Sequence, residues 1–222
     1  MRPAILVLAW AAVAHAIPGM DSLFRQTSVF VPGQDVIRVR PSTSDGTSDF
    51  VLRSSNAPGI AGDAVVTDLD ANWQYPPPLF FIDPANSKLM LFVNSTTMLH
   101  VNVLNTTKPE QFQNFDKGGE PVPLTSAQIP LKVAFSKKSE GIKGGVWSYI
   151  GTLLTYDLPA HLTKGNGRQT NQGIFFQCSS GKAYKPGLFT SLDPSVIPNT
   201  CNVVTLHSMN APSAVHQQRQ EL

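Results

Sequence analysis

Short segments with strand-like patterns recur along the chain, and turn residues separate them. Residues 35–40 alternate polar and apolar side chains, which is the period of a strand with one buried face. Residues 79–82 and 88–93 are apolar and flank 83–87, where Pro and Asp/Asn favour a turn, so this region predicts a hairpin. No convincing amphipathic helix follows the first 16 residues. The pattern predicts an all-β fold, an antiparallel sandwich or barrel in a single domain with disordered termini.

Other segments carry the same signal more briefly. The strand pair around Gly151 spans 146–156, where Trp147 and Tyr149 share one face and are predicted to be core residues. The loop 108–123 is expected to turn Phe112 and Phe115 inward, and the polar segment 161–172 is expected to be exposed. Further strands are expected at 28–31, 49–53, 64–66, 98–103, 129–135, 174–178, 187–192 and 201–207.

The N-terminus has the pattern of a secretory signal peptide. Arg2 precedes an apolar run over 4–14, and Ala14-His15-Ala16 supplies the small residues that signal peptidase requires. The run is shorter than the roughly 20 apolar residues needed to span a membrane, and no later stretch is longer. We therefore predict a secreted protein, extracellular or in the cell wall, without a membrane span. The predicted segments are a signal peptide (1–16), an N-terminal lead-in (17–26), a β-rich domain (27–209) and a disordered polar tail (210–222).

Two further features suit an extracellular protein. Asn94-Ser95-Thr96 and Asn105-Thr106-Thr107 are N-glycosylation sequons, although such triplets also arise by chance. The chain has two cysteines, Cys178 and Cys201, and an even number in an oxidising compartment indicates one disulfide. Two free buried thiols and a metal-binding pair are the alternatives. No histidine lies close in sequence to complete a zinc site.

The sequence predicts neither an enzyme nor a nucleic-acid-binding protein. Lys and Arg number 17 and Asp and Glu 15, so the formal net charge is only +2, and no basic stripe is visible. Nucleophile-elbow, metalloprotease and phosphate-loop motifs do not occur. We therefore predict no catalytic residue, no metal and no cofactor. The sequence indicates no particular oligomeric state.

Several acidic residues are candidates for a glycosidase pair, which needs two carboxylates about 5–10 Å apart. Asp68 and Asp70 are interpreted as solvated loop acids, and Asp83 as a turn residue. The other candidates are Asp63 and Asp157.

Two aromatic residues are candidates for contacting sugars. Trp73 and Tyr75 lie in a Pro-rich loop, and an exposed aromatic ring can stack on the apolar face of a sugar. The alternative is that these rings pack against the domain.

Several segments together carry a resemblance to a known family. They are Leu79-Phe80-Phe81-Ile82, Leu89-Met90-Leu91-Phe92, Trp147-Ser148-Tyr149, Ile174-Phe175-Phe176-Gln177-Cys178 and Cys201-Asn202-Val203-Val204-Thr205-Leu206. In this order they resemble the secreted cell-wall proteins of the PhiA type from filamentous fungi. The Phe-Gln-Cys-x-Ser-Gly stretch is also similar to the C-terminal domain of yeast cell-wall proteins with internal repeats. The resemblance implies a secreted, β-rich wall protein.

The chain departs from both groups. It lacks the additional cysteine pair of the PhiA pattern, and it has no Gln-rich repeats through which the yeast proteins attach to glucan. The leading hypothesis is a secreted, glycosylated, non-enzymatic structural or adhesive protein of a fungal cell wall, with wall polysaccharide as the expected partner. The alternative is a secreted carbohydrate-binding or effector-like module. A divergent secreted hydrolase is the third hypothesis.

Overall fold

The computed structural model describes most of the predicted β-rich segment. Contacts divide the chain into Met1–Val31 and Pro32–Leu222, and every described residue belongs to the second unit. The predicted signal peptide, lead-in, strand 28–31 and polar tail lie outside the described residues. The structure describes residues 34–42, 50–68, 77–106, 112, 114–115, 118–163, 167–178, 187–198 and 201–209.

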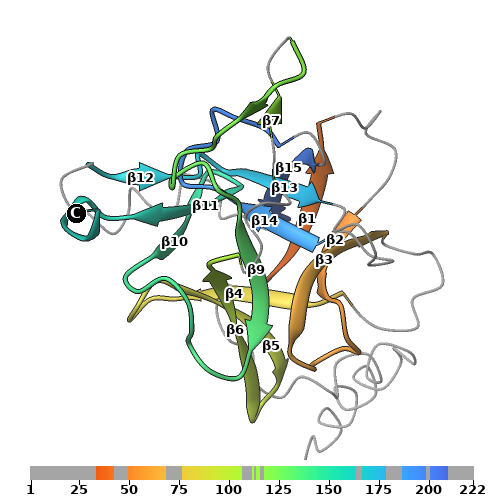
Figure 1. Ribbon diagram of the computed structural model, residues 1–222. Coiled ribbons are helices and arrows are strands. Elements are labelled where there is room, and N and C mark those ends of the chain that lie inside the picture. The colour runs from red at the N-terminus through yellow and green to blue at the C-terminus, as the bar shows by residue number, and fades with distance from the viewer. Residues whose placement is uncertain are drawn as a thin grey trace, which may run out of the picture. The chain divides into compact units, whose positions relative to one another are not determined.

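These residues form an almost wholly antiparallel β structure (Figure 1), which confirms the predicted fold class. Twelve strands make up three successive groups of four. The first group is β1 (Asp35–Pro41), β2 (Phe50–Ser54), β3 (Gly62–Asp68) and β4 (Leu79–Asp83). The second is β5 (Lys88–Asn94), β6 (Thr97–Leu104), β9 (Leu131–Ser136) and β10 (Val146–Ile150). The third is β11 (Leu153–Leu158), β13 (Ile174–Cys178), β14 (Gly187–Thr190) and β15 (Cys201–Ser208).

The sheet closes on itself. Nine strands form a closed antiparallel circuit in the order β1, β4, β5, β6, β9, β3, β14, β13 and β15, and β15 pairs with β1 again. Closure leaves these strands paired on both sides, which removes the open edges that favour association of sheets between molecules.

The three groups are arranged with approximate threefold symmetry. Their third strands, β3, β9 and β14, pair with one another in all three combinations. Their first and last strands form a ring through the pairs β1–β4, β4–β5, β10–β11, β11–β15 and β15–β1. Between β10 and β5 the ring is bridged by the Trp147 N–H, which donates to the Ser87 carbonyl at 2.9 Å. A ring capped by three hairpins is the topology of a β-trefoil.

Alternating side chains of the strands fill the interior. Phe80 and Phe135 contact one another from the first and second groups, with ring centroids 6.2 Å apart. Trp147 contacts Tyr156 and stacks parallel to Phe175 from the third group, at centroid distances of 4.9 and 6.2 Å. Trp147 is 2% exposed, and Tyr149 is half-buried against the same cluster, so both belong to the core as predicted.

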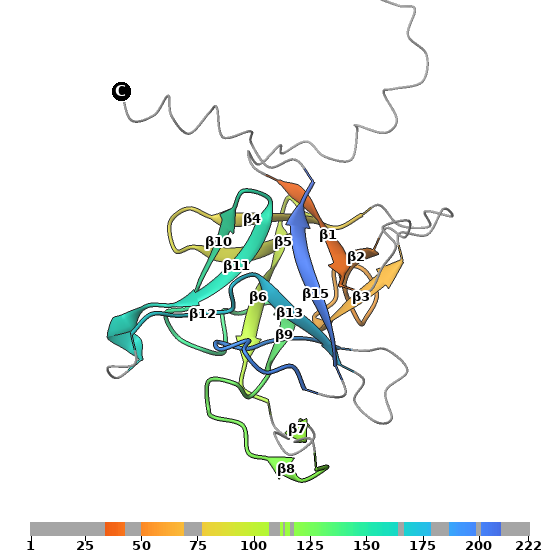
Figure 2. The same cartoon turned by 90° about the horizontal axis from the view of Figure 1, so that it is seen from above.

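The long connection between β6 and β9 covers a second, smaller apolar cluster. It contains the short ribbon of β7 (Asn114–Phe115) and β8 (Pro121–Val122), which lies to one side of the main sheet in Figure 2. Phe112 is buried as predicted and meets Phe189 edge-on, with ring centroids 5.0 Å apart. The predicted inward placement of Phe115 concerns a side chain outside the described set.

One local prediction holds only in part, since His161, Leu162, Arg168 and Gln172 are exposed but two other residues of the segment are not. The polar segment 161–172 was expected to be exposed, but Thr163 is buried and Asn171 has no exposed surface. The segment also contributes β12 (Gln169–Thr170), which pairs with β11, and a single 3-10 turn, η2 (Ala160–Leu162), precedes it. The polar side chains are buried because they satisfy backbone groups, which composition alone does not reveal.

Candidate functional site

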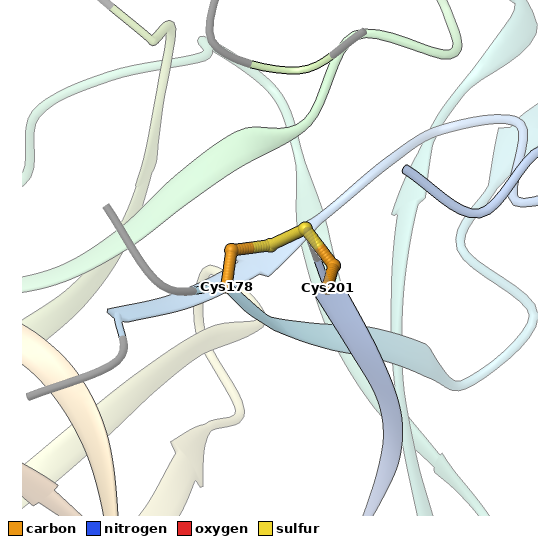
Figure 3. Close-up of a disulfide and its surroundings, with 2 residues drawn as sticks. All are labelled: Cys178 and Cys201. Atoms are coloured by element: carbon orange, nitrogen blue, oxygen red, sulfur yellow. A yellow bond between two sulfur atoms is a disulfide. The ribbon is translucent and has the colours of Figure 1, made fainter. Parts of the chain in front are cut away.

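The two cysteines are joined in a disulfide at one end of the β13–β15 pair (Figure 3). Cys178 and Cys201 are direct register partners, with Cα atoms 4.1 Å apart. Cys178 is buried against Phe176 and Phe189 in the smaller apolar cluster. The predicted disulfide is therefore present, and the alternatives of free thiols or a metal pair are excluded.

The first sequon forms the tip of the β5–β6 hairpin. Asn94 is exposed and lies opposite Thr97 across the turn. Its side-chain Oδ1 accepts a hydrogen bond from the Thr96 N–H at 3.0 Å and is 2.9 Å from the Thr96 hydroxyl, which donates to it. These bonds orient the Asn94 amide at an exposed turn.

The second sequon begins directly after β6. Asn105 is exposed, and its sequon partner Thr107 lies outside the described residues. Both asparagines are therefore accessible in the folded domain, and their modification stays a prediction.

Trp73 and Tyr75, the candidate sugar-contacting residues, lie in the segment 69–76, which is also outside the described residues. Their role likewise stays a prediction.

The described acidic candidates each serve a local contact. Asp157 is buried on β11 and accepts a hydrogen bond from Arg168 at 2.8 Å in an ion pair. Asp63 pairs with Lys132 at 2.7 Å. Asp83 accepts from the Ala85 N–H at 3.0 Å and so belongs to its turn, as predicted.

The acidic candidates that the structure describes do not form a recognisable metal site. Asp68 is exposed at the end of β3, and Asp70 lies outside the described residues. In the part of the chain that the structure describes, no group of three or more His, Cys, Asp or Glu side chains is arranged to hold a metal ion.

Among the described histidines, His207 makes hydrogen bonds through both ring nitrogens. Its Nδ1 is 3.0 Å from the Thr152 hydroxyl, and its Nε2 is 2.9 Å from the Thr205 hydroxyl. Burial lowers the pKa of His207 below its usual value, and the nearby Arg40 guanidinium lowers it further. The ring is therefore held in its neutral form, with one nitrogen donating and the other accepting.

Comparison with known proteins assigns no family. No protein-family model and no curated protein matches the chain. A similarity exists to the solved structure of full-length CARDS toxin, with 11% sequence identity and a TM-score of 0.42. The match covers 82% of this chain and 28% of the toxin, so the chain spans under a third of the toxin's length. Such a distant match carries no information about function.

Among the described residues, no helix has the length and apolar character needed to cross a membrane.

The structure also brings together residues that the sequence did not single out. Arg40 lies opposite Thr205, two residues from His207 on β15, although Arg40 and His207 are 167 positions apart in the chain. The available signal was the alternation in 35–40, which places Arg38 and Arg40 on the polar face of one strand. The partner strand could not be identified from that pattern.

Proposed function

We propose that the protein is a secreted, N-glycosylated, non-enzymatic component of a filamentous-fungal cell wall with a structural or adhesive role. The observation that carries the proposal is the Cys178–Cys201 disulfide in a chain that begins with a secretory signal pattern. Disulfides form and persist in oxidising compartments and are rare in the cytosol. The exposed positions of Asn94 and Asn105 suit modification in the secretory pathway.

The fold supports a scaffold role. The closed antiparallel sheet encloses a continuous apolar core, and a disulfide joins two of its strands. Such a fold resists unfolding outside the cell. Its loops and strand faces are then available for contacts with neighbouring wall material. Wall association itself is supported by the resemblance to the PhiA-type proteins.

Fractionation of the producing fungus tests this proposal. The protein is expected in the wall fraction and is expected to be released by hot detergent, because the chain lacks the Gln-rich repeats used for covalent attachment. Recovery of the full-length protein inside the cell, or entirely from the medium, contradicts the proposal. A secreted control protein of similar size should be recovered from the medium alone, which shows that the wall fraction is not contaminated by proteins from the medium.

The alternative functions are separated by assays on purified protein. A carbohydrate-binding module is expected to sediment with insoluble glucan or chitin, and Trp73→Ala is then expected to reduce retention. A hydrolase is expected to release soluble sugar from the same material. Sedimentation without sugar release favours binding, and sugar release contradicts the non-enzymatic assignment.

A further inference from the structure

The outward face of the β5–β6 hairpin carries an aromatic side chain close to the first sequon. Leu91 belongs to the main core cluster and Val93 packs against it, so Phe92 between them points outward. Asn94 follows Val93, points outward as well and is exposed. Phe92 is half-buried, so it retains solvent-accessible surface. An aromatic residue therefore lies two positions before a glycan acceptor, on the same face of the hairpin.

Strand pairing places two more apolar side chains on this face. Phe92 lies directly opposite Leu79 on β4 and Met98 on β6, and opposite residues of an antiparallel pair project to the same face. The strands β4, β5 and β6 are neighbours in the sheet (Figure 1). Leu79 is half-buried, and Met98 is 37% exposed. Leu79, Phe92 and Met98 thus form an apolar row across three strands, which we call the Phe92 strip.

The turn of the hairpin determines how the Asn94 amide is held beside this strip. The register shifts at a bulge between Phe92 and Asn94, and bulges bend a strand and re-aim its side chains. The Asn94 Oδ1 accepts hydrogen bonds from the Thr96 N–H and hydroxyl at 3.0 and 2.9 Å. The turn therefore holds the amide through its oxygen, and the amide nitrogen is the atom to which an N-linked sugar is joined.

We propose that the first N-acetylglucosamine of the Asn94 glycan packs on the Phe92 strip and stabilises the folded domain through this contact. The inference rests on the proposed function, which already includes a glycan on Asn94, and it names the protein surface that this glycan contacts. Residues two apart on a strand are separated by about 7 Å. A sugar joined directly to the Asn94 side chain can therefore reach the Phe92 ring.

The chemistry of the sugar suits an apolar strip with an aromatic centre. One face of a β-linked N-acetylglucosamine presents the C–H bonds of C1, C3 and C5, and its acetamido group adds a methyl. The face of an aromatic ring is electron-rich and attracts such C–H groups. Leu79 and Met98 extend the apolar area that the sugar removes from water. Because the sugar is tethered to Asn94, its local concentration at the ring is high.

The second sequon provides an internal control. Val103 occupies the corresponding position, two residues before Asn105, but it is 2% exposed and belongs to the main core cluster. A glycan on Asn105 therefore has no aromatic side chain at that position to contact. The two glycans share the same linkage chemistry and differ in the side chain two residues earlier.

A thermodynamic cycle on the full-length secreted protein tests the proposal. The wild type, Asn94→Gln, Phe92→Leu and the double variant are trimmed with an endoglycosidase that leaves a single N-acetylglucosamine at each site. The Asn94 sugar is expected to raise the unfolding temperature by about 2–4 °C when Phe92 is present, as an interaction of aromatic-pair strength does in a domain of this size. In the Phe92→Leu background the gain is expected to be less than half as large. Asn105→Gln should change the unfolding temperature by less than about 1 °C.

Nuclear magnetic resonance of the trimmed wild-type protein gives a second measurement, which keeps the test valid if Phe92→Leu does not fold. Protons that lie over an aromatic ring are shifted to higher field by its ring current. The sugar protons on Asn94 are therefore expected at higher field than those on Asn105, and Asn105→Gln assigns the two sets. A purely structural role of Phe92 would not produce this difference.

The contrary results separate this inference from the wall assignment. An equal gain from the sugar with Phe92 and with Leu at this position, or sugar protons on Asn94 and Asn105 at the same field, overturns the packing on Phe92 and leaves the wall assignment standing. A wild-type protein secreted without a glycan on Asn94 overturns both this inference and the glycoprotein part of the proposed function. A protein that passes both tests but is absent from the wall supports the packing and overturns the wall assignment.

Discussion

The side-chain carbonyl of Asn171 accepts a hydrogen bond from the backbone N–H of Tyr156 at 2.8 Å. The same oxygen accepts from the Gly173 N–H at 2.9 Å, and the amide nitrogen donates to the Thr190 hydroxyl at 3.0 Å. One fully buried amide thus connects β11, the turn before β13, and β14. It lies inside a segment whose composition suggests a surface loop.

Removal of this amide should therefore destabilise the fold. Asn171→Ala leaves the backbone N–H groups of Tyr156 and Gly173 without this acceptor, while the Thr190 hydroxyl keeps its bond to the Ile174 carbonyl. Each buried unsatisfied group costs about 1–3 kcal/mol. We expect the free energy of unfolding to fall by about 3 kcal/mol, measured by urea denaturation. Asn202→Ala, at an exposed position of β15, is the matched control and should change it little. Equal effects in the two variants would show that Asn171 does not organise the third group.

The disulfide is expected to be a second source of stability. Cys178 and Cys201 are 23 residues apart, and closing a loop of that length stabilises a fold by about 3 kcal/mol on the chain-entropy model. The double variant Cys178→Ala/Cys201→Ala should lose an amount of this order in urea denaturation. Reduction of the wild-type protein with dithiothreitol is the parallel measurement. A reduced protein as stable as the oxidised one would contradict the prediction.

The hairpin of β4 and β5 could be predicted because its information is local. Asp83 accepts hydrogen bonds from Ala85 and from the Asn86 side chain, so the turn residues specify the register of the strands around them. The strand pair around Gly151 is similar, since Gly151 adopts a φ of 61° that favours glycine. At both turns, interactions between residues close in sequence favour the same conformation that the residues adopt in the fold.

The threefold arrangement could not be predicted in the same way. It depends on β3, β9 and β14 meeting one another, and Gly62 pairs with Phe135 while Gly187 pairs with Val65. The alternation of polar and apolar side chains along one strand does not identify a partner strand so distant in the sequence. The three groups also carry connections of different length, such as 105–130 between β6 and β9, which obscure any repeat in the sequence.

The surroundings of His207 could not be predicted for the same reason. Arg38 and Arg40 are recognisable as the polar positions of one strand, but His207 and Arg53 join them only through strand pairing. The sequons and the cysteines were found because their signals are contained in a few residues.

The two sequons give a direct test of the secretory assignment. Asn94→Gln and Asn105→Gln should each remove one glycan from the secreted protein, which is seen as a loss of mass that enzymatic deglycosylation abolishes. Asn202→Gln, outside any sequon, should leave the mass unchanged apart from the substitution. Because both asparagines are exposed, neither change should lower the unfolding temperature of the deglycosylated protein appreciably. A wild-type protein with no glycan would contradict the glycoprotein prediction.

His207 should make stability depend on pH in the weakly acidic range. Burial, and then the Arg40 charge, lower its pKa in the folded protein below the value of 6.5 that applies to the unfolded chain. The unfolded chain therefore binds more protons between the two values, and the free energy of unfolding rises with pH across that interval. The stabilising contribution is complete above the unfolded pKa and is lost as the pH falls through 6.5 toward the lowered folded value.

Thermal unfolding between about pH 7 and pH 5 measures this dependence. The wild-type unfolding temperature should fall with decreasing pH more steeply than that of His207→Gln, which cannot be protonated in this range. His161→Gln, at an exposed position of η2, should retain the wild-type slope. If the unfolding temperatures of the wild type and His207→Gln fall equally with decreasing pH, the folded state does not disfavour protonation of the His207 ring. Arg40→Gln should lie between the two, because it removes the charge but leaves the ring half-buried and hydrogen-bonded to Thr152 and Thr205.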